Sequence, residues 1–281
     1  MLTWSEFYNQ FSLQLNEQQQ SAVQSVTGPV LLLAVPGSGK TTVLVTRLGY
    51  MIFCRGIAPE KILTVTYTVA ATKDMSERFA SRFGQDLADR LEFRTINGIC
   101  ARVIQYYGRK TARTAFSLLT DEKRISAILS AIYQKTEQVY PTEGDLKNVR
   151  TLITYIKNRM LNEKEIEALD ETAEIRISAI YKEYCKHLRE NQLMDYDDQM
   201  VYAYTMLRSV PELLRHFQEL YPYICVDEAQ DTSKIQHAII ALLASGSENL
   251  FMVGDEDQSI YGFRAAYPEA LKKIIRMQKS C

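Results

Sequence analysis

The sequence Ala34-Val35-Pro36-Gly37-Ser38-Gly39-Lys40-Thr41 joins an apolar run at residues 30–33 to a segment with apolar residues at helical spacing. This order predicts a strand, a glycine-rich loop and a helix. Small residues let backbone N–H groups close around phosphate oxygens, and the helix N-terminus adds partial positive charge there. Lys40 can reach the β- and γ-phosphates of a nucleotide, and the Thr41 hydroxyl can hold Mg²⁺. The stretch therefore predicts a nucleotide-phosphate site, although Ala34 replaces the usual first glycine.

The composition is that of an ordinary globular protein. Of its 281 residues, 46% are hydrophobic and 24% are charged, and the formal net charge is −1. With this net charge the protein has no overall positive potential that would attract nucleic acid, although a locally basic groove can still bind it. The five scattered cysteines contain no C-x-x-C pair, which argues against a disulfide framework or a cysteine metal site. The first ten residues show no signal-peptide pattern, and no apolar run reaches membrane-spanning length. We expect a cytoplasmic location and no membrane partner.

Short apolar segments alternate with helical patterns over much of the chain. The predicted strands lie at residues 30–33, 62–67, 93–95, 223–226 and 250–253. Predicted helices include residues 16–26, where Asn16 can cap and Gln19 can complete a capping box, and residues 71–83, which Gly84 ends. A further helix is expected to end at Gly108. Alternation of this kind predicts an α/β fold with a parallel sheet covered on both faces.

The pattern changes between about residue 108 and Asp195, where no strand is evident. Helices are predicted from about residue 122, over 146–160 and over 166–188, so this part reads as an all-helical insert. Residues 101–160 contain 11 Lys/Arg against 5 Asp/Glu, whereas residues 161–195 contain 5 against 9. The basic half is compatible with a nucleic-acid backbone and equally with solvated helix faces.

Acidic residues follow the strand at 223–226. Asp227 and Glu228 stand at its carboxyl end, the edge at which parallel sheets bind ligands. Asp227 can bind Mg²⁺, directly or through water, and Glu228 can orient or deprotonate an attacking water. The pair therefore predicts the hydrolytic half of a nucleotide site.

The strand at 250–253 is followed by a third group of functional residue types. Gln258 can hydrogen-bond a γ-phosphate and so report its loss. Tyr261, Phe263 and Arg264 come next, and aromatic and arginine side chains stack on the bases of single strands at about 1–3 kcal/mol per base. This stretch predicts a link between nucleotide and single-stranded nucleic acid.

Together these stretches resemble superfamily 1 DNA helicases of the UvrD/Rep/PcrA type. The resemblance rests on residues 34–41, on Val226-Asp227-Glu228-Ala229-Gln230-Asp231 and on residues 254–264, and extends to 15–19, 66–68 and 195–198. It implies a RecA-like P-loop NTPase core at 1–105 and 196–281 with a helical insert at 106–195. It further implies ATP and Mg²⁺, and DNA partners that include single strands and single/double-strand junctions. The resemblance also implies that the protein moves along single-stranded DNA in the 3′ to 5′ direction.

The resemblance also assigns roles to individual residues. Gln19 would read adenine, and Tyr67 would stack on a base. Lys40, Glu228 and Gln258 would be the catalytic residues, and Thr41 and Asp227 would bind the metal. The residues assigned to ATP are Gln19, Ala34, Val35, Pro36, Gly37, Ser38, Gly39, Lys40, Thr41 and Thr42. Those assigned to DNA are Tyr67, Thr68, Asn97, Tyr261, Phe263 and Arg264.

The chain departs from the family pattern in two ways. Val69 stands where the family usually has Asn, and Thr95-Ile96-Asn97-Gly98 stands where it usually has Thr-Phe-His-Ser. The family pattern also continues into a second motor lobe that supplies arginine fingers, whereas this sequence ends at Cys281. We expect an N-terminal segment of a longer protein, in preference to a shortened relative. Such a segment should bind Mg·ATP weakly and hydrolyse little, because a missing arginine finger costs about 10³–10⁵ in rate.

Two other functions are compatible with these residues. One is the motor half of a helicase–nuclease. The other is an ATP-gated DNA-binding or signalling module that does not separate strands. Stimulation of ATP hydrolysis by single-stranded DNA distinguishes a motor from the signalling module.

Overall fold

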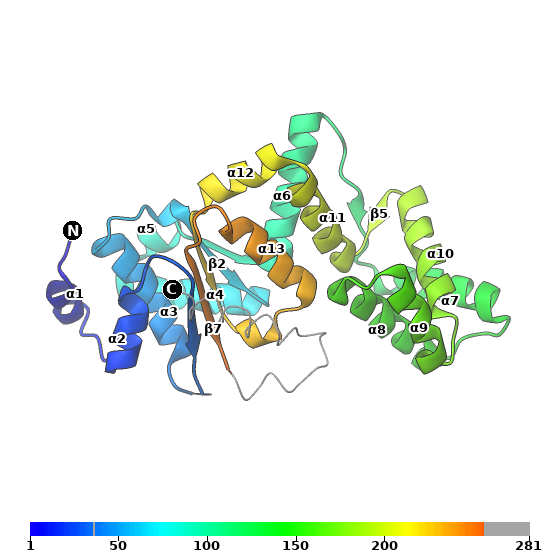
Figure 1. Ribbon diagram of the computed structural model, residues 1–281, viewed down its shortest axis with the longest axis horizontal. Coiled ribbons are helices and arrows are strands. Elements are labelled where there is room, and N and C mark those ends of the chain that lie inside the picture. Colours follow the sequence, from blue (N-terminus) through cyan, green and yellow to red (C-terminus); the bar gives the residue numbers. More distant parts are fainter. Residues whose placement is uncertain (36, 256–281) are drawn as a thin grey trace.

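The computed structural model describes residues 1–35 and 37–255 of the chain. A five-stranded parallel sheet with helices on its two faces forms the larger part (Figure 1), and a group of helices, α7 to α10, extends from it. The order along the sheet is β1-β7-β6-β2-β3. These strands are β1 (Val30–Leu33), β2 (Ile62–Thr66), β3 (Glu92–Thr95), β6 (Tyr223–Val226) and β7 (Leu250–Gly254). The predicted α/β fold is confirmed.

The strand register brings the predicted functional stretches to one edge. Leu33 pairs with Gly254, and Val226 pairs with Met252 and Val65. Because all these pairs are parallel, β1, β2, β6 and β7 end on the same side of the sheet. The loops that follow them therefore meet at that edge.

One face of the sheet is covered by the N-terminal helices. These are α1 (Trp4–Gln10), α2 (Glu17–Gln24), α3 (Lys40–Phe53), α4 (Val69–Phe83) and the short α5 (Gln85–Ala88). Helices α3 and α4 approach closely, since a Cβ on Gly49 would lie 2.4 Å from the Phe83 ring. Helix α1 was not predicted, and neither was α5. A capping box between Thr3 and Glu6 begins α1, and its Phe7 is fully buried.

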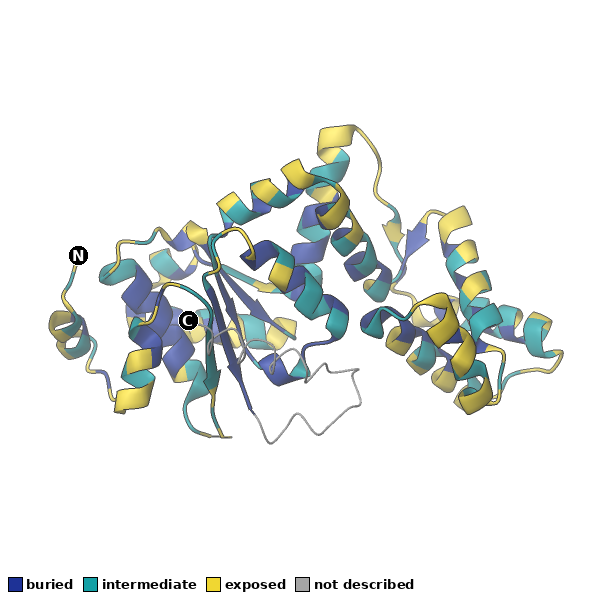
Figure 2. Ribbon diagram, viewed as in Figure 1, coloured by how far each residue is buried: buried dark blue, intermediate teal, exposed yellow. Residues whose placement is uncertain are grey.

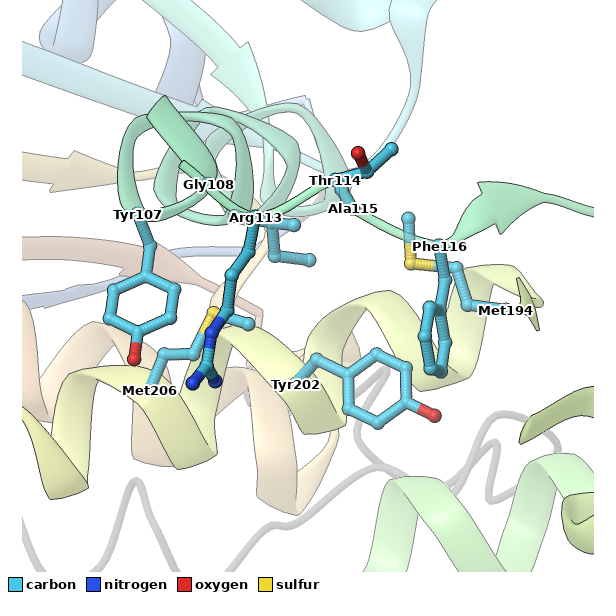
Figure 3. Close-up of a pocket in the computed structure, with 10 residues that line it drawn as sticks. Tyr107, Gly108, Arg113, Thr114, Ala115, Phe116, Met194, Tyr202 and Met206 are labelled. Carbon is cyan, nitrogen blue, oxygen red and sulfur yellow. The ribbon is translucent and has the colours of Figure 1, made fainter. Parts of the chain in front are cut away.

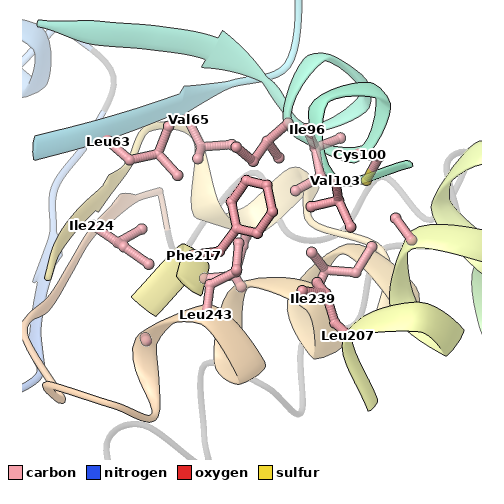
Figure 4. Close-up of a cluster of buried hydrophobic side chains, with 14 of the residues drawn as sticks. Leu63, Val65, Ile96, Cys100, Val103, Leu207, Phe217, Ile224, Ile239 and Leu243 are labelled. Carbon is pink, nitrogen blue, oxygen red and sulfur yellow. The ribbon is translucent and has the colours of Figure 1, made fainter. Parts of the chain in front are cut away.

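The other face is covered by helices from the second half of the chain and by one earlier helix. They are α6 (Ile96–Thr111), α11 (Tyr196–Ser209), α12 (Pro211–Leu220) and α13 (Lys234–Ala244). Figure 4 shows their apolar side chains, including Leu207, Phe217 and Leu243, facing Leu63 and Ile224 of the strands. Figure 2 shows the central strands β2, β6 and β7 as mostly buried between these layers. The predicted cover on both faces is confirmed.

The remaining helices have a hydrophobic core of their own. They are α7 (Glu122–Glu137), α8 (Glu143–Arg159), α9 (Glu163–Ala173) and α10 (Ile177–Glu190). Residues such as Leu129, Val149 and Ile180 are buried among these helices. We call this group, residues 119–193, the helical arm.

The structure corrects the prediction for this part of the chain in two places. A two-stranded parallel sheet pairs β4 (Ser117–Leu118) with β5 (Leu193–Met194), where no strand was expected. The single helix predicted over 166–188 is two helices, because Glu174 ends α9 in the left-handed region at φ 55°. The Asp170 carboxylate then accepts hydrogen bonds from the Ser178 N–H and hydroxyl, which fixes the turn.

Several helices and strands also begin or end at residues other than those predicted. Helix α6 continues three residues past Gly108 and ends where Ala112 adopts a left-handed conformation at φ 52°. Strand β2 ends at Thr66, one residue early, and α4 begins at Val69 because the Thr68 hydroxyl caps it. By sequence, Pro268 also fits the first position of a final helix, and this stretch lies outside the described residues.

The arm meets the sheet-bearing part at a buried lysine. Lys157 of α8, whose side chain is 1% exposed, places Nζ 2.7 Å from both Asp195 Oδ2 and Asp198 Oδ1 at the start of α11. The Tyr184 hydroxyl donates to the same Asp195 oxygen at 3.2 Å. Burial lowers the pKa of Lys157, but the two carboxylates more than reverse this, and the pKa is raised. We call Lys157, Asp195 and Asp198 the joint network.

Among the described residues, no helix is both long enough and apolar enough to cross a membrane. The cysteines at 54, 100, 185 and 225 are free thiols.

Candidate functional site

Backbone conformation and strand pairing shape the glycine-rich loop. The Ala34 N–H donates to the Gly254 carbonyl at 3.0 Å, which holds the start of the loop against the end of β7. Gly37 and Gly39 have φ values of 77° and 82°, a region that residues with a Cβ rarely adopt. Gly39 immediately precedes α3, so the loop opens at a helix N-terminus, where unpaired N–H groups favour anions. Pro36 lies outside the described residues.

Gln19 holds the loop from the side of α2. Its Oε1 accepts from the Asn16 N–H at 3.0 Å, and its Nε2 donates to the Ser38 carbonyl at 3.0 Å. The first bond completes the predicted capping box, which is confirmed. The second connects α2 to the loop. The assignment of Gln19 to adenine stays a prediction.

Lys40 lies between side chains from two other strand ends. Its Nζ is 3.4 Å from Glu228 Oε2 and 3.8 Å from Asp255 Oδ2. These distances exceed the 2.7–2.9 Å of a strong charge-assisted hydrogen bond. The ammonium is thus placed among carboxylates from β6 and β7 without tight pairing to either one.

Asp227 is a buried carboxylate of the site, with 7% of its surface exposed. Burial, and then the negative charge of Glu228, raises the pKa of Asp227 to about 6. The Glu228 N–H, which donates to Asp227 Oδ1 at 3.1 Å, and Lys40 oppose this increase. A carboxylate with so little compensation is suited to a cation.

The residues present fit a magnesium ion bound with a nucleotide. Asp227 and the hydroxyl of Thr41, the second residue of α3, are hard oxygen donors, which Mg²⁺ prefers. No group of three His, Cys, Asp or Glu side chains within the described ranges could hold a metal alone. In proteins Mg²⁺ usually takes one or two carboxylates and completes its coordination shell with phosphates and water.

Glu228 has a strained backbone. Its φ of 48° and ψ of 47° lie in the left-handed region, which costs a residue with a Cβ about 1–2 kcal/mol. The 3₁₀ turn η2 (Ala229–Asp231) follows directly. Gln230 in this turn donates from Nε2 to Glu228 Oε2 at 2.7 Å, while its Oε1 accepts from the Asp255 N–H at 2.9 Å.

The predicted DNA residues that the structure describes lie after β2 and β3. Tyr67 is half-buried, and its hydroxyl hydrogen-bonds that of Thr232. The Thr68 hydroxyl accepts from the Ala71 N–H at 3.0 Å as the cap of α4. Asn97 lies in the first turn of α6, and its Oδ1 is buried without a hydrogen-bond partner among the described residues. DNA contacts at all three positions stay predictions.

Other predicted site residues cannot be placed. Gln258, Tyr261, Phe263 and Arg264 lie outside the described residues. Of the predicted site residues that it describes, the structure brings Lys40, Asp227 and Glu228 together at the strand ends and places Gln19 against the loop at Ser38.

Sequence reasoning missed several residues of this region. Gln230 and Asp255 had no predicted role, although each contacts a predicted catalytic side chain. A cavity of about 180 Å³ beside Thr41 and Thr42 is also lined by Arg78 and Arg82 of α4. Two arginines four residues apart on one helix face were the available signal.

A separate cavity of about 250 Å³ lies between α6 and α11 (Figure 3). Tyr107, Phe116, Tyr202 and Met206 contribute to its largely apolar wall, and Arg113 lies among them. None of the predicted site residues within the described part of the chain lines it. It is therefore distinct from the site at the strand ends.

Comparison with known proteins gives consistent matches. The sequence profile of the family described as UvrD/REP helicase N-terminal domain matches residues 15–279. ATP-dependent DNA helicase PcrA of Bacillus subtilis (strain 168) is 34% identical over 264 residues, which cover 92% of this chain and 35% of that protein. The PcrA helicase of Leuconostoc citreum is 31% identical over 253 residues, covering 90% and 34%. That of Staphylococcus aureus (strain Mu50 / ATCC 700699) is 32% identical over 270 residues, covering 91% and 36%. The chain spans about a third of the length of these relatives.

Proposed function

The chain belongs to the UvrD/REP helicase family, and from that premise we propose that it is the ATP-binding part of a DNA helicase that moves 3′ to 5′ along single-stranded DNA. The observation that carries the proposal is the position of Lys40. Its ammonium lies 3.4 Å from Glu228 and 3.8 Å from Asp255, so the phosphate loop faces the ends of β6 and β7.

ATP is the substrate in this proposal. The loop at 34–41 holds its phosphates through backbone N–H groups and the start of α3. Lys40 stabilises charge on the β- and γ-phosphates, and Gln19 supports the loop through the Ser38 carbonyl. When bound, Mg²⁺ neutralises phosphate charge, and Thr41 and Asp227 are the residues that would hold it.

Glu228 is the proposed base for the attacking water. Its side chain is 43% exposed, so water can reach it, and Lys40 lies close to its carboxylate. Gln258 is the proposed reporter of the γ-phosphate. Positioning and charge stabilisation supply most of the catalysis in phosphoryl transfer, which is why the spacing of these side chains matters.

The DNA would lie against residues that follow the sheet edge. Tyr67, Thr68 and Asn97 are the proposed contacts from β2 and β3, with Tyr261, Phe263 and Arg264 completing the set. We further propose the division into a RecA-like core at 1–105 and 196–281 and an insert at 106–195. The separate hydrophobic core of the helical arm supports this division. Single/double-strand junctions, a cytoplasmic location and a second motor lobe elsewhere in the protein belong to the same proposal.

The test is ATP hydrolysis by the natural-length protein with and without single-stranded DNA. Wild-type protein should hydrolyse ATP faster with DNA and displace a strand from a duplex with a 3′ tail but not a 5′ tail. Glu228→Gln should still bind ATP and lose about 10²–10³ in turnover. The exposed Glu212 of α12 offers a matched control, because Glu212→Gln removes the same charge away from the site.

Three outcomes would contradict the proposal. Normal turnover by Glu228→Gln would remove Glu228 from its role. Hydrolysis that ignores DNA, together with no strand displacement, would favour the ATP-gated signalling module. Robust hydrolysis and unwinding by residues 1–281 alone would contradict the expectation that a second lobe is needed.

A further inference from the structure

Gln230 joins two strand ends through one buried amide. The residue is 3% exposed and lies in η2, just after Glu228. Its Nε2 donates to Glu228 Oε2 at 2.7 Å, and its Oε1 accepts from the Asp255 N–H at 2.9 Å. Each half of the amide therefore has a different partner, one from the β6 end and one from the β7 end.

The Glu228 carboxylate needs such a partner to stay in one place. Its backbone is in the left-handed region, and its side chain is 43% exposed. The contact with Lys40 at 3.4 Å is long, so it restrains the carboxylate only loosely. The bond from Gln230, at 2.7 Å, is the shorter of the two and fixes Oε2 directly.

Gln230 is in turn held by its surroundings. A Cβ on Gly254 would lie 3.2 Å from Gln230 Oε1 and 3.4 Å from the Ala229 Cβ, so the β7 backbone packs directly against the amide. The Asp255 N–H, in a residue 1% exposed, then orients the amide oxygen. This second bond leaves the NH₂ group pointing to Glu228.

We propose that Gln230 is a positioning residue that holds the Glu228 carboxylate in its hydrolytic orientation and fixes its position relative to the end of β7. The inference rests on the proposed function, since it assigns Gln230 a role through Glu228. Misplacement of a reacting group by about 1 Å can cost about 10²-fold in rate, so loss of this contact acts mainly on kcat. ATP binding, which depends on the loop and Lys40, stays nearly intact.

Glutamine is suited to this role because it offers a donor and an acceptor at this reach. Asparagine is one methylene shorter, and an ionised glutamate has no donor. The alternative is that Gln230 only satisfies the buried Asp255 N–H. The two roles use different atoms of the amide, so they can be tested separately.

The experiment uses two substitutions and a control in the natural-length protein. Gln230→Met loses both bonds, whereas Gln230→Glu keeps an oxygen for the Asp255 N–H and places a carboxylate against Glu228. Gln199→Met is the control, because Gln199 is also a buried glutamine, 6% exposed, on α11. The readouts are kcat, affinity for a non-hydrolysable ATP analogue, and hydrogen exchange of the Asp255 amide without nucleotide.

We expect both Gln230 variants to lose about 10–100-fold in kcat with analogue affinity within about threefold of wild type. Exchange of the Asp255 amide should accelerate at least about tenfold in Gln230→Met and stay near wild type in Gln230→Glu. Gln199→Met should change none of the three.

Two results would overturn the inference. One is a Gln230→Glu protein whose kcat stays within about twofold of wild type. The other is a loss of analogue affinity in Gln230→Met as large as its loss in kcat. If the wild-type protein fails to hydrolyse ATP, the proposed function fails as well. If Glu228→Gln loses turnover while Gln230→Met keeps it, the inference alone fails.

Discussion

Two lysines in this molecule each face a pair of carboxylates, and they differ in how tightly they are held. In the joint network, Lys157 Nζ lies 2.7 Å from both of its partners, and its side chain is 1% exposed. At the strand ends, Lys40 Nζ lies 3.4 and 3.8 Å from Glu228 and Asp255, and its side chain is 11% exposed. The first arrangement satisfies its charges internally, whereas the second leaves room for other charged groups.

The difference teaches how a structural charge cluster can be told from one prepared for a ligand. Burial of an ion pair is tolerated when short contacts and extra hydrogen bonds compensate it, as Tyr184 does beside Asp195. At the strand ends, in contrast, Asp227 has a raised pKa and Glu228 has a strained backbone. Backbone strain and an incompletely compensated buried charge are typical of functional sites, where a bound ligand can relieve them.

The strongest test of the comparison is the same replacement at both lysines, beginning with Lys157→Met. This change leaves Asp195 and Asp198 without their counter-ion in a buried site, and we expect the free energy of unfolding to fall by about 3–5 kcal/mol. Denaturant titration measures it. The exposed pair of Lys73 and Glu77 supplies the control, because Lys73→Met should change stability by no more than about 0.5 kcal/mol. A loss below about 1 kcal/mol at Lys157 would refute the structural role.

Lys40→Met should produce the opposite balance of effects. Its loss of stability should be less than half of that at Lys157, because its carboxylate contacts are long and Glu228 is partly solvated. ATP binding should weaken by about 10–150-fold, or about 1.5–3 kcal/mol, since a charged hydrogen-bond partner of the phosphates is lost. Calorimetric titration with Mg·ATP measures the affinity. Unchanged affinity would remove Lys40 from the phosphate site.

A smaller effect is expected from the pH dependence at Asp227. The folded-state pKa, about 6, lies above the ordinary value of 3.8, so between these values the folded state binds more protons than the unfolded state. Stability from this group is therefore lost as pH rises. We expect the free energy of unfolding of Asp227→Asn, relative to wild type, to increase by about 2 kcal/mol between pH 4.5 and 7 without metal or nucleotide. A pH-independent difference would show that the carboxyl titrates normally.

The sequence predicted the sheet well because most of its strands are apolar runs, of which the central three, β2, β6 and β7, are largely buried between the helix layers. Residues 30–33 and 62–66 are continuous apolar or β-branched runs, the pattern of parallel strands between helix layers. The pairing of Ser117–Leu118 with Leu193–Met194 was missed because two-residue strands carry no periodicity and depend on contacts about 75 residues apart in the chain. The division between α9 and α10 depends on the left-handed Glu174, a conformation that its residue type does not favour.

For the candidate site, local motifs were predictable and the contacts between them were not. Lys40, Asp227 and Glu228 follow strand ends in recognisable patterns, and the structure brings them together. Gln230 and Asp255 lie in the same stretches but had no predicted role, because their roles arise from a hydrogen bond that spans 25 positions. The geometry of Glu228 likewise depends on packing at the sheet edge, which residue type and spacing do not encode.

The pairing of β4 with β5 has a mechanical consequence. The chain passes from α6 into the helical arm and returns to α11 through these two strands, which run in the same direction. Hydrogen bonds from the Ser117 N–H to the Gln192 carbonyl at 2.9 Å and from the Leu119 N–H to the Met194 carbonyl at 2.8 Å connect them side by side. A load that pulls one strand along the other shears both bonds together instead of opening them one at a time. The connection made by β4 and β5 is therefore stiffest against sliding of one strand along the other. Force applied to the helical arm is transmitted to α6 and α11 together.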